Sequence, residues 1–174
     1  PQHKVNIQWS PKFAYAIWLL TTDGNLSPRR GNINFTSKDK EMIDNFLNCL
    51  NIQAAIGRKS RGVDNVKRYY VVQFGDVIFY QFLLDIGLMP NKSKILKKLK
   101  IPDKYFFDFL RGHFDGDGTF YSYWDPRWRS SFMFYTEFIS ASKQHVRWLQ
   151  KKIFLFLKIK KNITKSKGNS VYQL

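Results

Sequence analysis

The sequence predicts an α+β fold made of two related halves, each with the element order αββαββα, the second without its last helix. Two observations support this. An apolar segment with helical spacing twice runs into Asp-Gly and then into a β-prone stretch, at Asp23-Gly24 and again at Asp117-Gly118. The same order of helices and strands then follows each Asp-Gly pair. At 174 residues and 44% hydrophobic, the chain is long enough to bury a core as one domain or two fused halves.

The first half, residues 1–87, is predicted to contain three helices and four strands. Ser10 and Pro11 provide an N-cap and a first-turn proline for the first helix, and Gly87 ends the third. In the second helix, which opens at Ser37, the apolar residues recur on one face. The expected helices lie at 11–22, 37–50 and 76–86, and the expected strands at 25–27, 32–37, 53–58 and 67–74.

Residues 88–103 interrupt the pattern, because Pro90 and Pro102 bracket a lysine-rich stretch. We interpret this stretch as a basic linker, with the second repeat spanning residues 104–174. Helices are expected there at 105–116 and 142–157, and strands at 118–124, 130–140, 159–165 and 170–174. Since the sequence stops inside a strand, we expect the second repeat to be incomplete at its C-terminal end.

The charge balance favours a polyanionic partner. There are 29 Lys and Arg residues against 13 Asp and Glu, a formal charge of +16, and nucleic acid is the first candidate. An anionic membrane surface and ribosome-like packing against RNA are weaker alternatives. No apolar run approaches the ~20 residues of a membrane span.

A single cysteine, Cys49, excludes a disulfide framework and fits a reducing compartment. We therefore expect an intracellular protein, with an organelle and a bacterial or phage cytoplasm both open.

The two Asp-Gly pairs predict a metal site if the halves are related by a pseudo-twofold axis. Asp23 and Asp117 would then face each other, and a divalent cation would relieve their repulsion. Such an ion can activate water and stabilise a leaving oxygen in phosphodiester hydrolysis. Gly24 and Gly118 let the chain leave each helix in a conformation that a side chain would resist, and let backbone approach a phosphate. We assign these four residues to the predicted metal site.

Asp115 lies in the same stretch, but its counterpart in the first copy is Thr21. A role required of both halves is therefore better assigned to Asp117. Asp115 is expected to serve helix-end solvation or local hydrogen bonding.

These residues resemble the LAGLIDADG homing endonucleases. The run LRGHFDGDG at 110–118 is close to the nine-residue motif of that family, and AIWLLTTDG at 16–24 resembles a variant of it. The run LDIGLMPNKS at 84–93 resembles a segment often found ahead of the second motif. The resemblance spans nearly the whole chain.

The resemblance implies a pseudo-symmetric monomer that grips double-stranded DNA with two saddle-shaped sheets. Such a protein cuts both strands across the minor groove with a divalent metal, usually Mg²⁺, which Mn²⁺ or Ca²⁺ can replace in a bound structure. The last acid of each motif is the metal ligand in the family, which matches Asp23 and Asp117. A basic residue near the scissile phosphate is also typical, and Lys92 is the candidate in the first half.

One departure from the motif is Trp18, which stands where a small residue is usual. We expect Trp18 to pack against Gly112, large against small.

DNA contacts are expected from the polar face of each sheet, which alternates with the core face along a strand. Some would bind phosphates and others would read guanine edges, although a solvated surface charge is about as common for any one of them. The aromatic run at 121–129 fits either loop and core packing or contact with a nucleic-acid backbone. The candidates are Arg29, Arg30, Arg58, Lys59, Arg61, Lys67, Arg68, Tyr70, Arg127, Arg129, Lys161, Lys165 and Lys167.

The sequence therefore favours a site-specific double-strand DNA endonuclease encoded in a mobile intron or intein. The alternatives are an RNA maturase that binds intron RNA, a catalytically silent DNA-binding protein on the same fold, and a ribosome-associated structural protein.

Overall fold

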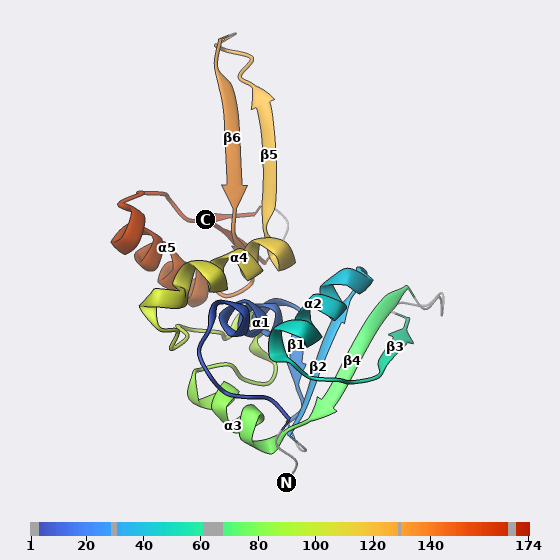
Figure 1. Ribbon diagram of the computed structural model, residues 1–174. Coiled ribbons are helices and arrows are strands. Elements are labelled where there is room, and N and C mark those ends of the chain that lie inside the picture. The colour runs from blue at the N-terminus through green and yellow to red at the C-terminus, as the bar shows by residue number, and fades with distance from the viewer. Residues whose placement is uncertain (1–3, 29–30, 61–67, 129, 167–169) are drawn as a thin grey trace. The chain divides into compact units, whose positions relative to one another are not determined.

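A computed structural model of the protein describes residues 4–28, 31–60, 68–128, 130–166 and 170–174 (Figure 1). The predicted α+β class is confirmed: the described residues form five α-helices and nine strands, and every strand pair is antiparallel. The chain divides into two compact units. Unit 1 comprises Pro1–Lys92 and Leu99–Gly112, and unit 2 comprises Ser93–Lys98 and His113–Leu174.

The first and third helices of unit 1 begin within one residue of the predicted starts at 11 and 76, whereas the second begins at Lys40, with Asp39 as its N-cap, rather than at Ser37. Helix α1 carries Pro11 in its first turn, and the Ser10 side chain accepts a hydrogen bond from the Phe13 N–H at 3.1 Å. The Asp76 carboxylate caps α3 in the same way, accepting from the Phe79 N–H at 2.9 Å. The elements are α1 Pro11–Thr22, β1 Gly24–Leu26, β2 Asn32–Ser37, α2 Lys40–Leu50, β3 Ile56–Lys59, β4 Tyr69–Gly75, α3 Val77–Asp85, the short 3-10 helices η1 Lys92–Lys94 and η2 Asp103–Tyr105, and α4 Phe106–Asp117, which continues into unit 2.

The four strands of unit 1 form one sheet in the order β1-β2-β4-β3 (Figure 1). Phe35 pairs with Gly24 on one side and with Val72 on the other, and Val72 pairs with Ile56. These residues share a face with the buried Leu26, Ile33 and Phe74. Strand β3 starts at Ile56, whereas the sequence pattern placed its start at Gln53.

Helix α1 packs against the first part of α4 through the contact predicted for Trp18. The buried Trp18 ring meets Phe109 edge to face, with the ring centroids 4.2 Å apart. A Cβ on Gly112 would lie 2.9 Å from the Trp18 Cβ and 2.9 Å from the Tyr15 carbonyl oxygen. Trp18 therefore packs against Gly112 as predicted. The two helices approach so closely that residue 112 has no room for a side chain.

Unit 2 contains the end of α4 followed by β5 Thr119–Trp124, β6 Phe132–Glu137, β7 Ile139–Ser140, α5 Lys143–Leu157, β8 Thr164–Lys165 and β9 Tyr172–Gln173. Strands β5 and β6 form a hairpin, and the remaining three pair in the order β7-β9-β8. The single strand expected at 130–140 is therefore wrong, since β6 and β7 pair with different neighbours. The strands expected at 159–165 and 170–174 are shorter than predicted.

The strand registers of the two units follow one scheme. Thr119 pairs with Glu137, so Gly118 lies opposite Phe138 as Gly24 lies opposite Phe35. The backbones of Phe138 and Leu174 exchange two hydrogen bonds of 3.0 Å, as the next strand pair requires. Gly118, Phe138 and Leu174 thus take the places that Gly24, Phe35 and Val72 hold in unit 1, which supports the repeat.

Two histidines are buried in unit 2. Burial lowers the pKa of His113 to about 3 and that of His145 to about 4. The ring of His113 lies 5.1 Å from that of Phe138, and His145 Nδ1 lies 2.7 Å from the Lys97 carbonyl oxygen. His113 stands where the first repeat has the buried Leu19. Both imidazoles are therefore neutral in the folded chain at pH 7.

These burials predict that acid destabilises the protein. Both pKa values lie below the ordinary value of about 6.5, so the unfolded chain binds more protons as the pH falls below 6.5, until the folded pKa values are reached. Relative to pH 7, the free energy of unfolding at pH 5 is expected to be lower by about 2 kcal/mol for each histidine. His113→Leu, which copies the first repeat, should remove roughly half of the loss. Urea unfolding at pH 7 and pH 5 measures it; equal pH dependence in both proteins would contradict the assignment.

The α1–α4 packing predicts that a smaller residue at Trp18 and a larger one at Gly112 both destabilise the fold. Trp18→Gly should leave a cavity and cost about 3–5 kcal/mol, with a lower melting temperature. Gly112→Ala should overpack the same place and cost about 1–3 kcal/mol. Thermal and urea unfolding measure both, and an unchanged melting temperature in either variant would count against this contact.

Candidate metal site and nucleic-acid interface

Asp23 is placed by the end of α1. It caps the helix with φ −97° and ψ −1°, and its N–H donates to the Leu19 carbonyl oxygen at 3.1 Å. The next residue, Gly24, begins β1, and a Cβ on it would lie 2.5 Å from the Leu20 carbonyl oxygen. The strand therefore turns back over the last helical turn, and only glycine fits that turn.

Asp117 and Gly118 repeat this arrangement in unit 2. Asp117 is the last residue of α4 and is exposed, while Gly118 donates its N–H to the Phe114 carbonyl oxygen at 3.0 Å. A Cβ on Gly118 would lie 2.5 Å from Phe114 Cα. In both copies the glycine is crowded by the residue four positions earlier, so the two acids occupy matching positions in their units.

Lys92 lies beside the first Asp-Gly pair, Asp23-Gly24. Its side chain is only 8% exposed, and its Nζ donates a hydrogen bond to the Gly24 carbonyl oxygen. Lys92 thus contacts the residue that directly follows Asp23, although the two are far apart in sequence. An ammonium in this place can offset the charge of a bound phosphate.

The protein ligands available to a metal are few. Among the residues that the structure describes, no three His, Cys, Asp or Glu side chains gather into a group. Asp23 belongs to unit 1 and Asp117 to unit 2. A carboxylate with phosphate and water oxygens is the donor set that Mg²⁺ and Mn²⁺ prefer, so these residues fit such an ion.

Six of the predicted DNA contacts, namely Arg29, Arg30, Arg61, Lys67, Arg129 and Lys167, lie outside the described residues. Arg58 and Tyr70 pair across β3 and β4. The Arg58 guanidinium contacts the Tyr70 hydroxyl and lies 4.4 Å from its ring centroid. Both residues share the face of Ile56 and Val72, which is the face that carries the buried Phe35. They lie at the exposed end of that face and not on the polar face from which DNA contacts are expected.

The other described candidates lie at exposed or edge positions. Lys59, the last residue of β3, pairs with Tyr69 on β4. Arg68 is exposed just before β4, and Lys165 is exposed on β8.

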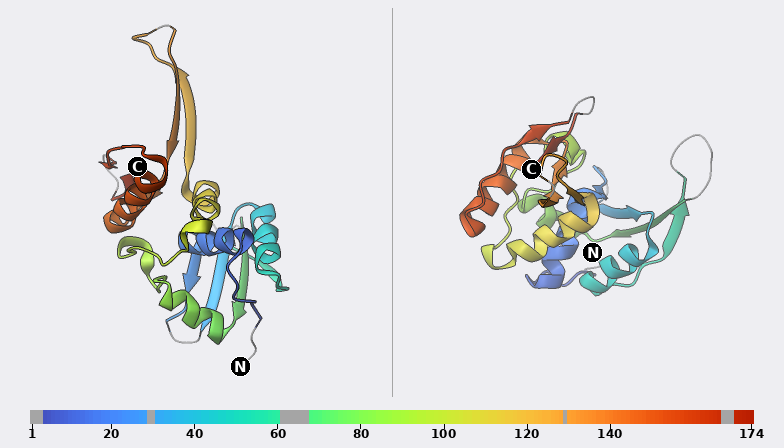
Figure 2. Two further views of the ribbon diagram at one scale, coloured as in Figure 1. Left: turned by 60° about the vertical axis from the view of Figure 1, so that its left-hand side comes forward. Right: turned by 90° about the horizontal axis from the view of Figure 1, so that it is seen from above.

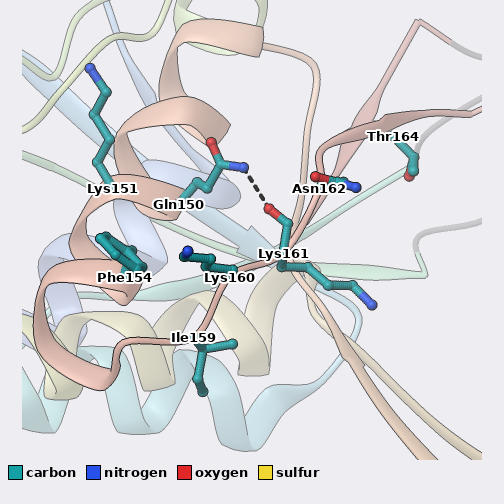
Figure 3. A pocket seen from close by; sticks show the side chains of 8 residues that line it. All are labelled: Gln150, Lys151, Phe154, Ile159, Lys160, Lys161, Asn162 and Thr164. Carbon is teal, nitrogen blue, oxygen red and sulfur yellow. Dashed lines mark hydrogen bonds between the residues drawn. The ribbon is translucent and has the colours of Figure 1, made fainter.

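Two candidates in unit 2 make contacts within their own unit. Arg127 forms an ion pair of 2.8 Å with Asp125, and hydrogen bonds from Arg127 hold the pKa of that carboxyl below its usual value. Lys161 Nζ lies 5.4 Å from the ring centroid of Tyr135. Lys161 also borders a groove of about 740 Å³ beside the end of α5, where its carbonyl oxygen accepts from the Gln150 side chain at 2.6 Å (Figure 3).

Three amide side chains form a row that the charge pattern of the sequence does not predict. Asn25, Asn34 and Gln73 pair side by side across β1, β2 and β4, on the face opposite the buried Phe35. Asn25 and Gln73 are exposed, and amide side chains can bind adenine with two hydrogen bonds. The alternation of Asn34 with apolar neighbours was a signal that could have found them.

Comparison with known structures identifies the fold. The N-terminal LAGLIDADG domain of DUF199/WhiA is similar with a TM-score of 0.54 at 15% identity, over 97% of this chain and 76% of that one. A structure of mesophilic variants from the homing endonuclease I-DmoI gives a TM-score of 0.59 at 14% identity, over 94% and 86%. The homing endonuclease I-WcaI, bound to its DNA recognition sequence, gives 0.57 at 15% identity, over 96% and 78%.

The chain therefore has a LAGLIDADG-like fold, as the motifs predict. No protein-family model matches the sequence. No curated protein matches it either. Among the described residues, no helix is both long and apolar enough to cross a bilayer.

The crowding at Gly24 predicts a large effect for a small change. Gly24→Ala should cost about 1–3 kcal/mol of folding free energy, because the added methyl meets backbone atoms that cannot move aside. Gly57→Ala is the matched control: its Cβ would lie 3.5 Å from Val71 Cγ1, an ordinary contact, so stability should change little. Urea denaturation compares the two, and equal stability would contradict the turn geometry.

Proposed function

We propose that the protein is a site-specific double-strand DNA endonuclease that hydrolyses phosphodiester bonds with a divalent metal ion. The observation that supports this most is the repeated turn: two helices of a LAGLIDADG-like fold each end in an aspartate followed by a glycine that has no room for a side chain. The structural neighbours include I-DmoI in complex with DNA and Mn, at a TM-score of 0.58 and 11% identity. The charge of +16 suits a DNA partner.

In this proposal Asp23 and Asp117 hold the metal from the two halves of a monomer. A divalent ion bound there would activate water and stabilise the leaving oxygen. Gly24 and Gly118 let a phosphate come close to the backbone beside each acid. Lys92 balances negative charge next to Asp23, since its ammonium contacts the adjoining residue.

The outer face of the unit 1 sheet is the proposed base-reading surface. Asn25, Asn34 and Gln73 would read base edges in the major groove, with Lys59 nearby on β3 for a phosphate. Neutral amides add specificity rather than charge, so the basic side chains at the sheet ends would provide most of the affinity.

The test begins with selection, because the target site is unknown. A library of randomised duplexes is bound by the protein in Ca²⁺, and the enriched sequences are then incubated with Mg²⁺. We expect double-strand cuts at one position. Asp23→Asn and Asp117→Asn should each lower the cleavage rate by roughly 10²–10³-fold while duplex binding persists.

Asp115→Asn is the matched control, since it removes a carboxylate from the same helix without a counterpart in the other copy. It should cleave within a few-fold of the unchanged protein. Enrichment without cleavage would instead favour a catalytically silent DNA-binding protein. Tight binding of its intron RNA without duplex enrichment would favour the maturase.

A further inference from the structure

The positive charge of the chain is concentrated in the C-terminal part of unit 2. Residues 138–174 contain nine Lys and Arg residues and no Asp or Glu, whereas residues 1–137 contain 20 and 13. More than half of the net charge of +16 therefore comes from this part of the chain. Several of these cations lie at the end of α5 and in the segment 158–163 that follows it. A surface that carries cations alone attracts a polyanion.

The end of α5 and the segment after it form a groove. Lys158 ends the helix in the left-handed conformation, with φ 59°, and donates its N–H to the Phe154 carbonyl oxygen at 3.0 Å. The chain then turns back beside the helix toward β8 (Figures 1 and 2). The groove between them has a volume of about 740 Å³, in the range of clefts that hold a molecule the size of a nucleotide. Figure 3 shows Gln150, Lys151 and Phe154 on its helix side and Lys160, Lys161 and Asn162 on the returning segment.

The first repeat shows that the fold does not require these charges. Asn51 ends α2 with φ 51°, as Lys158 ends α5. Both segments then reach the next strand after the same number of residues, since Gly57 of β3 and Thr164 of β8 hold equivalent places in their sheets. Asn adopts the left-handed conformation more readily than lysine does. The lysines at 158, 160 and 161 thus stand where the first repeat has Asn51, Gln53 and Ala54.

The exposure of the lysine segment does not depend on a third helix in the second repeat. Unit 1 has such a helix, α3, which packs elsewhere, with the Phe79 ring 6.0 Å from that of Phe13 in α1. With α3 in place, the residues of unit 1 that correspond to the lysine segment are still exposed, namely Asn51, Gln53 and Ala55. The surface of the segment is therefore set by α5 and β8, the two elements that it connects.

An exposed ring lies among the lysines. Phe154 is 42% exposed, and the Nζ atoms of Lys158 and Lys160 each lie 6.0 Å from its ring centroid. Lys158 Nζ also donates to the Leu155 carbonyl oxygen at 3.2 Å, and an ammonium has three N–H groups. A base stacked on the ring would have its phosphates beside both ammonium groups, with the exposed amide of Asn162 close by for a base edge. Cations and an aromatic ring in one groove are the combination that holds single strands.

We propose that this groove, formed by the end of α5 and residues 158–164, binds a single-stranded segment of nucleic acid. Its phosphates would lie between the lysines, and one base would stack on Phe154. An intact duplex keeps the faces of its bases stacked on one another, so it does not offer this contact. The groove is thus a binding site beyond the proposed duplex cleavage, and it needs no divalent metal. RNA and DNA single strands share the chemistry that it recognises.

The test measures fluorescence anisotropy of labelled oligouridylate and oligothymidylate with the full chain in EDTA. We expect both strands to bind, and the stronger of the two identifies the sugar that the groove prefers. Lys158→Asn with Lys160→Gln copies the first repeat and should lower single-strand affinity at least about tenfold. It should also reduce the slope of log affinity against log salt by about 1.4, since two phosphate contacts are lost. Lys98→Gln with Lys100→Gln removes the same charge from exposed lysines elsewhere and is the matched control.

A second variant isolates stacking from charge. Phe154→Ala should lower single-strand affinity about tenfold without changing the salt slope, because stacking releases no counterions. Phe154→Tyr keeps a ring and should bind as the unchanged chain does. Since the side chain is exposed, the fold should persist in both variants, which circular dichroism checks.

Three results would overturn the proposal. One is a single-strand affinity that falls equally in the Lys158→Asn, Lys160→Gln pair and in its matched control. Another is a loss with Phe154→Ala that is the same for a duplex of equal length as for the single strand. The third is displacement of the bound strand by phosphatidylserine vesicles but not by unlabelled strand, which would make a membrane surface the occupant. None of these results bears on cleavage of the selected duplex in Mg²⁺, so the two proposals fail separately.

Discussion

The first strand of each repeat turns back on the helix before it so tightly that the residue at the turn has no room for a side chain. In unit 1 the residue is Gly24, crowded by Leu20, and in unit 2 it is Gly118, crowded by Phe114. This constraint decides what precedes and follows it. The residue before the glycine must end the helix, and the strand after it must start in a fixed register. The placement of both aspartates follows from these turns.

The two repeats keep this turn and differ in what packs around it. Trp18 and Gly112 are equivalent positions with the largest and smallest side chains, and they pack against each other in unit 1. Leu19 and His113 are another such pair, one apolar and one held neutral by burial. Gene duplication followed by divergence would produce this combination, because packing tolerates compensating changes and the acid-glycine turn does not.

The helices could be predicted from the sequence because their signals are local. Ser10, Asp76 and the apolar spacing of α2 define starts and faces without reference to the rest of the chain. The strands of unit 2 were predicted less well, because pairing partners decide where a strand ends. Phe138 pairs with Leu174, and no local pattern reveals that β6 and β7 divide there.

The candidate site shows the same division between local and distant signals. Asp23, Gly24, Asp117 and Gly118 were found from a repeated pattern, and Lys92 only through the family resemblance. Sequence spacing alone does not bring Lys92 to Gly24. The amide row of Asn25, Asn34 and Gln73 depends on the register of three strands, so it became visible only in the folded sheet.

We propose that Asp23 and Asp117 hold one metal ion together. The most direct measurement is affinity cleavage of the protein bound to its selected DNA, with Fe²⁺ in place of Mg²⁺ and with ascorbate and peroxide, so that radicals cut the polypeptide beside the ion. Cuts near residues 23 and 117 are predicted in the same preparation, and both should disappear in Asp23→Asn alone. Cuts at only one of these places, or cuts near residue 117 that persist in Asp23→Asn, would contradict the shared site.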